Sequence, residues 1–155
     1  MHDNHARTAR VAGLGTSLPG KVLTNSYFES ILETTDEWIV TRTGMRERHV
    51  VSPGESLATV AVEAGKRALA DAGVDPEEIE LLILATATPE QPIPATSALI
   101  QPALGVRRAV CFDLSAACSG FLYALKVARQ FFITGEVSTA MVIGAETLSR
   151  YVDYT

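Results

Sequence analysis

The sequence contains few of the residues that mark several common classes of protein. Its 155 residues include two cysteines, three histidines and one tryptophan. The two cysteines, Cys111 and Cys118, match no zinc spacing and form no disulfide framework, so we expect no bound metal and a reducing, cytoplasmic compartment. The net charge of −5 provides no positive field that would attract nucleic acid or an anionic membrane.

Long apolar runs are also missing. No uncharged apolar stretch reaches the roughly 18 residues that a membrane span requires, and the first residues lack the apolar core of a signal peptide. Residues 1–8 are polar, and we expect them to form a flexible leader in which His2 and His5 bind no metal. Residues 9–155 are enough for one domain with a buried core.

Short apolar runs predict the strands. They occur at residues 79–85, 109–114 and 139–145, and a further strand is expected at residues 10–15. The run Leu81-Leu-Ile-Leu84 shows no alternation with polar residues, which is typical of a strand buried on both faces of a parallel sheet.

Helical patterns separate these strands. Apolar periodicity predicts helices at residues 57–72, 95–104 and about 118–134. Two short helices are expected earlier, one at residues 26–32 capped by Asn25 and one that is capped by Asp36 and stopped by Gly44. The alternation of strands and helices predicts an α/β fold with a mostly parallel sheet and helices on both faces.

Cys118 lies where the strand at 109–114 gives way to the long helix. A helix N-terminus carries about half a positive charge and several unpaired N–H groups, both of which favour the nucleophilic thiolate. The neighbours of Cys118 are small and would let a carbonyl group approach the sulfur. The alternative is a buried cysteine that only fills space. The helix itself is apolar on nearly every side, which predicts burial.

Trp38 and Arg42 are four residues apart and therefore share one face of the second short helix. A tryptophan ring beside a guanidinium group could hold a planar aromatic ligand by stacking and cation–π contact. A packing pair on the protein surface is equally compatible with this spacing.

Three motifs carry a resemblance to a known family. They are Asp36-Glu-Trp-Ile-Val-Thr-Arg-Thr-Gly-Met-Arg-Glu-Arg48, Phe112-Asp-Leu-Ser-Ala-Ala-Cys-Ser-Gly-Phe121 and Val142-Ile-Gly-Ala-Glu-Thr-Leu-Ser149. From about Val11 to Thr155, the sequence resembles β-ketoacyl-acyl carrier protein synthase III. This family belongs to the thiolase-fold superfamily, so the resemblance implies the N-terminal half of a thiolase-like fold.

The resemblance also implies roles for individual residues. Cys118 matches the nucleophile that takes an acyl group from acyl-coenzyme A, and its backbone N–H would help form an oxyanion hole. Trp38 and Arg42 match the pair that sandwiches the adenine of coenzyme A, and Thr34 matches a residue that contacts the same base. Ile93 matches an apolar residue that crosses the dimer interface and borders the partner's acyl pocket. Acyl-coenzyme A is a substrate, so no cofactor is expected.

The sequence departs from the family in its length. The family is roughly twice as long, and its catalytic histidine and asparagine lie in a second half that this sequence lacks. We therefore expect an N-terminal half that works with a C-terminal half segment and in a homodimer. The implied reaction loads a short acyl group on Cys118 and joins it to malonyl-acyl carrier protein with decarboxylation, which starts fatty-acid synthesis.

Two alternatives stay open at this point. The chain could belong to a related thiolase-fold enzyme of secondary metabolism, because the motifs do not fix the acyl group. It could also be a half that binds coenzyme A without catalysis. A thiol protease is the least favoured class, because no histidine motif accompanies Cys118.

Overall fold

The computed structural model describes residues 8–154. The chain forms two compact units, which we call the sheet unit (Met1–Ser17 with Leu57–Glu146) and the hairpin unit (Leu18–Ser56 with Thr147–Thr155). Residues 1–7 of the expected leader, including both of its histidines, lie outside the described residues. No helix among residues 8–154 is long and apolar enough to cross a membrane.

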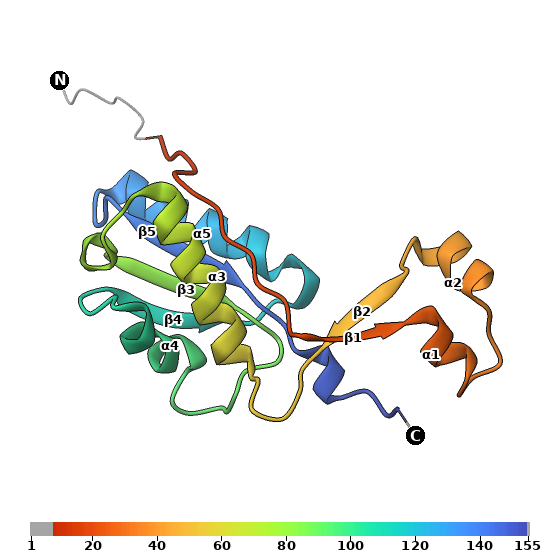
Figure 1. Ribbon diagram of the computed structural model, residues 1–155. Coiled ribbons are helices and arrows are strands. Elements are labelled where there is room, and N and C mark those ends of the chain that lie inside the picture. The colour runs from red at the N-terminus through yellow and green to blue at the C-terminus, as the bar shows by residue number, and fades with distance from the viewer. Residues whose placement is uncertain (1–7, 155) are drawn as a thin grey trace. The chain divides into compact units, whose positions relative to one another are not determined.

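The sheet unit is built on a parallel sheet of three strands. The central strand β3 (Leu81–Ala85) pairs with β4 (Val110–Leu114) on one side and with β5 (Ala140–Gly144) on the other (Figure 1). All five residues of β3 are buried. The three apolar runs that the sequence predicts as strands are therefore confirmed, and so is the parallel arrangement.

Helices cover both faces of this sheet. On one face, α3 (Leu57–Ala72) and α4 (Thr96–Leu104) pack over Leu82 and Leu84. On the other face, α5 (Gly120–Thr134) packs over Leu81, Ile83 and Ala85 through its small residues (Figure 1). Because alternate residues of β3 point to opposite faces, one apolar run supplies both cores. The predicted α/β architecture is confirmed.

The strand predicted at residues 10–15 is wrong. This segment pairs with no strand among the described residues and lies against α3 instead. A Cβ atom on Gly15 would lie 2.2 Å from the carbonyl oxygen of Ala64 in α3, so only glycine permits the approach. The N–H of Leu14 donates to the Asp71 carboxylate at 2.9 Å. Residues 10–15 are thus held by hydrogen bonding to α3 and not by pairing with a neighbouring strand.

The hairpin unit contains two antiparallel strands that the sequence did not predict. β1 (Lys21–Thr24) pairs with β2 (Glu47–Val50), so that Thr24 lies opposite Glu47. Two short helices, α1 (Asn25–Glu29) and α2 (Asp36–Thr43), connect the strands. The chain returns to this unit after β5, where a short 3₁₀ turn forms at Leu148–Arg150.

Both caps predicted for these short helices are wrong. Helix α1 starts at Asn25 itself and ends at Glu29, before the predicted Leu32. Helix α2 is capped by Thr35, whose hydroxyl accepts a hydrogen bond from the N–H of Trp38 at 3.1 Å. Asn25 and Asp36 bond to each other instead, which removes both side chains from capping. Gly44 stops α2 with a φ of 73°, as predicted.

Candidate functional site

Cys118 lies in a single 3₁₀ turn, Ala117–Ser119, between the end of β4 and the start of α5. The predicted placement at a strand-to-helix junction is confirmed, although α5 begins two residues later, at Gly120. The thiol is free and Cys118 is exposed. The turn sits at the carboxyl ends of the parallel strands, where α/β proteins commonly bind their ligands.

The backbone of this turn has an unusual shape. Ala117 has a φ of +46°, a left-handed conformation that costs a residue with a side chain roughly 1–3 kcal/mol. Directly after the turn, a Cβ on Gly120 would lie 3.4 Å from the Cβ of Ala85, so the helix starts in close contact with the end of β3. This sharp change of direction presents Cys118 at the surface while α5 turns back over the sheet.

A carboxylate that the sequence analysis missed organises the neighbouring loop. Glu146, two residues after β5, accepts hydrogen bonds from the N–H of Ala87 at 2.8 Å and from the hydroxyl of Thr88 at 2.6 Å. The N–H of Thr86 donates to the carbonyl of Leu114 at 3.1 Å. The ends of all three strands are thus tied together beside the Cys118 turn. Glu146 lies within the third motif, but the motif does not show what its carboxylate binds, because its partners are about sixty residues away.

Asp113 in β4 was also missed, although the sequence does carry a signal for it. An acidic residue between Phe112 and Leu114 in an apolar strand needs a hydrogen-bond partner. Its carboxylate accepts from the N–H groups of Thr96 and Ser97, each at 2.8 Å. Asp113 therefore fixes the start of α4 to the strand that leads to Cys118.

The second cysteine has a different environment. The Cys111 thiol is partly buried and donates to the side-chain oxygen of Gln101 at 3.2 Å. Burial raises the pKa of Cys111, and the charge of Asp113 raises it further, while a hydrogen bond with Ser97 acts in the opposite direction. Cys111 is therefore held as the neutral thiol, which is the unreactive form.

Trp38 and Arg42 stack on each other along α2, as their spacing predicts. The guanidinium carbon of Arg42 lies 4.7 Å from the centroid of the Trp38 ring, and Trp38 is 55% exposed. The Thr34 hydroxyl oxygen is buried and has no hydrogen-bond partner within residues 8–154. The structure confirms the Trp38–Arg42 contact, whereas the roles of these three residues toward a ligand stay predictions.

Ile93 lies in the loop before α4. It is 86% exposed, which leaves its side chain available for contact with another chain. Its assignment to a dimer interface stays a prediction.

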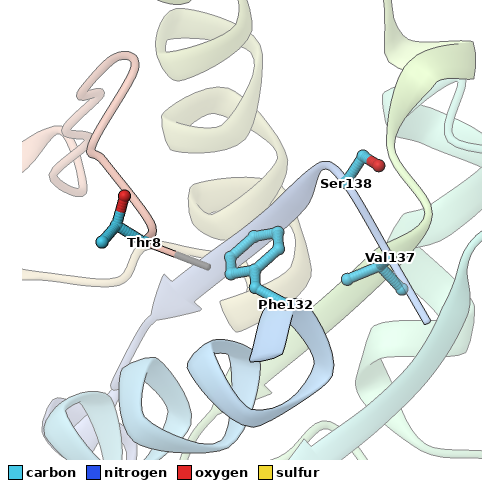
Figure 2. Close-up of a pocket in the computed structure, with 4 residues that line it drawn as sticks. All are labelled: Thr8, Phe132, Val137 and Ser138. Carbon is cyan, nitrogen blue, oxygen red and sulfur yellow. The ribbon is translucent and has the colours of Figure 1, made fainter. Parts of the chain in front are cut away.

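A surface pocket of about 320 Å³ opens elsewhere in the sheet unit. Figure 2 shows its lining residues Thr8, Phe132, Val137 and Ser138. Phe132 lies about 18 Å along the axis of α5 from Gly120 at 1.5 Å per residue, so this pocket is remote from the Cys118 turn. None of the predicted site residues lines it. Within residues 8–154, no cluster of His, Cys, Asp and Glu is arranged to hold a metal ion.

Comparisons with known proteins show which sequences and structures the chain is similar to. The family model described as 3-Oxoacyl-[acyl-carrier-protein (ACP)] synthase III matches residues 112–155, which include Cys118. A curated β-ketoacyl-[acyl-carrier-protein] synthase III from Rhodospirillum centenum is 50% identical over 145 residues, which are 94% of this chain and 45% of the relative. The predicted resemblance to β-ketoacyl-acyl carrier protein synthase III is confirmed.

Solved structures of similar proteins extend the match to the fold. The 3-oxoacyl-[acyl-carrier-protein] synthase III from Aquifex aeolicus has a TM-score of 0.91 and 46% identity, and the match covers 95% of this chain and 47% of that one. The priming β-ketosynthase of the R1128 polyketide biosynthetic pathway also has a TM-score of 0.91, with 38% identity, 96% coverage of this chain and 45% of its own. The chain has the thiolase-like fold of these similar structures and spans about half the length of the relatives it matches.

Proposed function

We propose that this chain supplies the nucleophile and part of the coenzyme A site of a β-ketoacyl-acyl carrier protein synthase III. The Cys118 thiolate attacks the carbonyl carbon of acetyl-coenzyme A or another short acyl-coenzyme A. A new thioester bond forms at Cys118, the bond to the coenzyme A sulfur breaks, and coenzyme A leaves as its thiolate, which takes up a proton from the solvent. Malonyl-acyl carrier protein then loses CO₂, and its carbanion displaces Cys118 to give a 3-oxoacyl-acyl carrier protein.

The observation that carries this proposal is the exposed thiol in the strained turn before α5. The N–H groups of Ser119 and Gly120 donate to the carbonyl oxygens of Ala116 and Ala117 within this turn, and the Ser119 side chain makes no capping hydrogen bond. The N–H of Cys118 is suited to help stabilise the oxyanion that forms when a thiolate attacks a carbonyl group.

The hairpin unit would bind the nucleotide end of the substrate. The exposed Trp38 ring with Arg42 stacked on it supports the proposed sandwich around adenine, because both groups bind planar aromatic rings. In this conformation the buried Thr34 hydroxyl would have to rotate to reach a base. No cofactor enters the proposed reaction, since acyl-coenzyme A is consumed as a substrate.

Two uncovered apolar surfaces support further protein partners. Leu122 on the outer face of α5 is 67% exposed, and Val110 in β4 is 58% exposed. Strand β4 pairs only with β3 among residues 8–154. We place a C-terminal half segment, with the catalytic histidine and asparagine, on the outer face of α5. We place a homodimer mate near the strand at 109–114 and Ile93. The free thiols Cys111 and Cys118 agree with a reducing cytoplasm.

A second candidate is an enzyme of secondary metabolism. The observation that favours it is the match to the R1128 priming β-ketosynthase, whose TM-score equals that of the Aquifex enzyme. Both candidates use the same nucleophile and differ in the acyl group and in the carrier protein. Turnover of a series of acyl-coenzyme A donors against both kinds of malonyl-carrier protein separates them, and absence of turnover with all of them would favour a half that only binds coenzyme A.

The test of the nucleophile is covalent labelling. The complete enzyme is incubated with radiolabelled acetyl-coenzyme A without malonyl-acyl carrier protein, digested, and the labelled peptide identified. We expect one labelled thioester at Cys118, no label in Cys118→Ala, and full label in the matched control Cys111→Ser. Label on Cys111, or a thioester retained in Cys118→Ala, would refute the proposal.

A further inference from the structure

Asn25 is a buried amide at the junction of β1 and α1, and its exposed fraction is only 2%. Its side-chain NH₂ group donates to the Asp36 carboxylate at 2.7 Å and to the carbonyl oxygen of Met45 at 3.0 Å. Its side-chain oxygen accepts from the guanidinium group of Arg48. Its backbone N–H donates to the carbonyl of Arg46 at 3.2 Å. Every polar atom of the side chain is therefore used.

Two of these partners, Asp36 and Met45, lie at the two ends of α2. Asp36 is the first residue of this eight-residue helix, and Met45 follows Gly44, which ends it. One amide thus holds both ends of the helix. Glu29 strengthens the first end, because its carboxylate accepts from the N–H of Asp36 at 2.7 Å.

The helix between these two anchors carries the proposed adenine clamp. Trp38 lies in its first turn and Arg42 in its last. A shift or rotation at either end would therefore change where the ring and the guanidinium group lie relative to each other and to a ligand. A helix this short has little stability of its own in water, so interactions with the rest of the protein must fix its position.

We propose that Asn25 is a positioning residue for coenzyme A recognition, which holds α2 so that Trp38 and Arg42 accept the nucleotide end of the substrate. This inference rests on the proposed role of Trp38 and Arg42. An amide is required because two acceptors and one donor converge on it. Alanine would leave the Asp36 carboxylate, the Met45 carbonyl and the Arg48 guanidinium without this partner, and aspartate would set two carboxylates against each other.

The test compares two substrates in the complete enzyme. Acetyl-coenzyme A carries the nucleotide, whereas acetyl-pantetheine has the same thioester and lacks it. In Asn25→Ala we expect KM for acetyl-coenzyme A to rise by about two- to thirtyfold, because misplacing the Trp38 ring should cost about as much as removing it. We expect kcat to stay within about twofold, and kcat/KM for acetyl-pantetheine to stay unchanged, because Asn25 does not touch the reacting thioester.

Three further variants separate positioning from general destabilisation. Asp36→Ala removes one anchor and should shift the same KM in the same direction, whereas Asp36→Asn keeps an acceptor oxygen and should restore it. Val50→Ala is the matched control, because Val50 is buried in β2 at the opposite end of the hairpin, where it pairs with Lys21. It should lower the melting temperature without changing the preference for acetyl-coenzyme A over acetyl-pantetheine.

Measurements in Trp38→Ala distinguish an error in the proposed adenine clamp from an error in the positioning role of Asn25. If Trp38→Ala leaves KM for acetyl-coenzyme A unchanged, the proposed adenine clamp is wrong, whatever Asn25 does. If Trp38→Ala raises KM but Asn25→Ala does not, the positioning role is overturned. An equal loss of kcat/KM with acetyl-pantetheine in Asn25→Ala would overturn it too. So would a KM for acetyl-coenzyme A that rises in the Trp38→Ala, Asn25→Ala double variant by as much again as in Asn25→Ala alone. The proposal is supported if Asn25→Ala raises KM for acetyl-coenzyme A in the parent protein but causes no further rise in Trp38→Ala.

Discussion

The Trp38–Arg42 pair gives a quantitative prediction, because a base can be sandwiched there only if the pair opens. The guanidinium carbon of Arg42 lies 4.7 Å from the ring centroid. Two stacked layers need about 3.5 Å each, or about 7 Å between the ring and the guanidinium group. Arg42 must therefore move outward by about 2 Å before adenine enters, and its interaction with Trp38 is replaced by one with the base.

The expected size of the effect follows from this exchange of partners. Base–aromatic stacking contributes about 1–3 kcal/mol, and giving up the cation–π interaction between Arg42 and Trp38 at an exposed site costs about 0.5–1 kcal/mol. Trp38→Ala should therefore weaken coenzyme A binding by about 0.5–2 kcal/mol, a two- to thirtyfold rise in Kd. The cost of opening disappears in Arg42→Ala as well. This variant should have a smaller effect, because the cation–π contact that it removes from the base contributes only about 0.5–1 kcal/mol, which is less than base–aromatic stacking.

Isothermal titration with coenzyme A and with pantetheine measures these effects. Only the coenzyme A titration should respond to either variant. The matched control is Val22→Ala, which shortens an exposed apolar side chain of β1 in the same unit and should leave Kd unchanged. An unchanged Kd for coenzyme A in Trp38→Ala would refute the reasoning. So would a larger effect of Arg42→Ala than of Trp38→Ala, or an equal loss of pantetheine binding.

Three other predictions concern reactivity, pH and solubility. Iodoacetamide should alkylate Cys118 before Cys111, because burial raises the pKa of Cys111; peptide mapping that shows equal rates would contradict this. Hydrogen bonds from the backbone N–H groups of Gly20 and Ser52 lower the pKa of Glu55, so its stabilising effect is present above the ordinary carboxyl pKa and lost as pH falls. The melting temperature of Glu55→Gln should accordingly fall less on acidification than that of the parent protein. An identical dependence of melting temperature on pH would count against the assignment. Residues 1–155 expressed alone should aggregate or bind hydrophobic dyes; a soluble monomer with a sharp melt would show that the apolar face of α5 needs no cover.

The central strand of the sheet unit could be predicted because burial determines it. The run Leu81–Leu84 has to be a strand covered on both faces, since each of its side chains is apolar and each is buried in the structure. The strands of the hairpin unit carry no comparable pattern. β1 is Lys-Val-Leu-Thr and β2 is Glu-Arg-His-Val, and only one residue of each is buried. Their pairing depends on interactions across an intervening pair of helices, which no local pattern records.

The residues of the candidate site were likewise predicted only in part. Motif and spacing located Cys118, Trp38 and Arg42, since helical periodicity fixes which residues share a face. Asn25, which bonds to the first residue of α2, was misassigned, and the bonds of Glu146 to Ala87 and Thr88 were missed. Asn25 has the composition of a helix cap, but its burial and its bond to Asp36 give it another role. Hydrogen bonds between distant segments depend on the tertiary fold, so they become visible only once that fold is known.

Helix α5 connects the nucleophile to the proposed partner segment. Its small residues Ala124 and Ala128 face the sheet and allow close packing, while large apolar residues, such as Leu122, face outward. Contiguous apolar surface of this kind is rare on soluble monomers, so a segment that covers it is expected. Because α5 begins two residues after Cys118, a segment packed along its outer face from Phe121 onward would end beside the thiol. The same packing that buries α5 would therefore bring the side chains of that segment within reach of the acyl group, which is where a histidine and an asparagine would have to act.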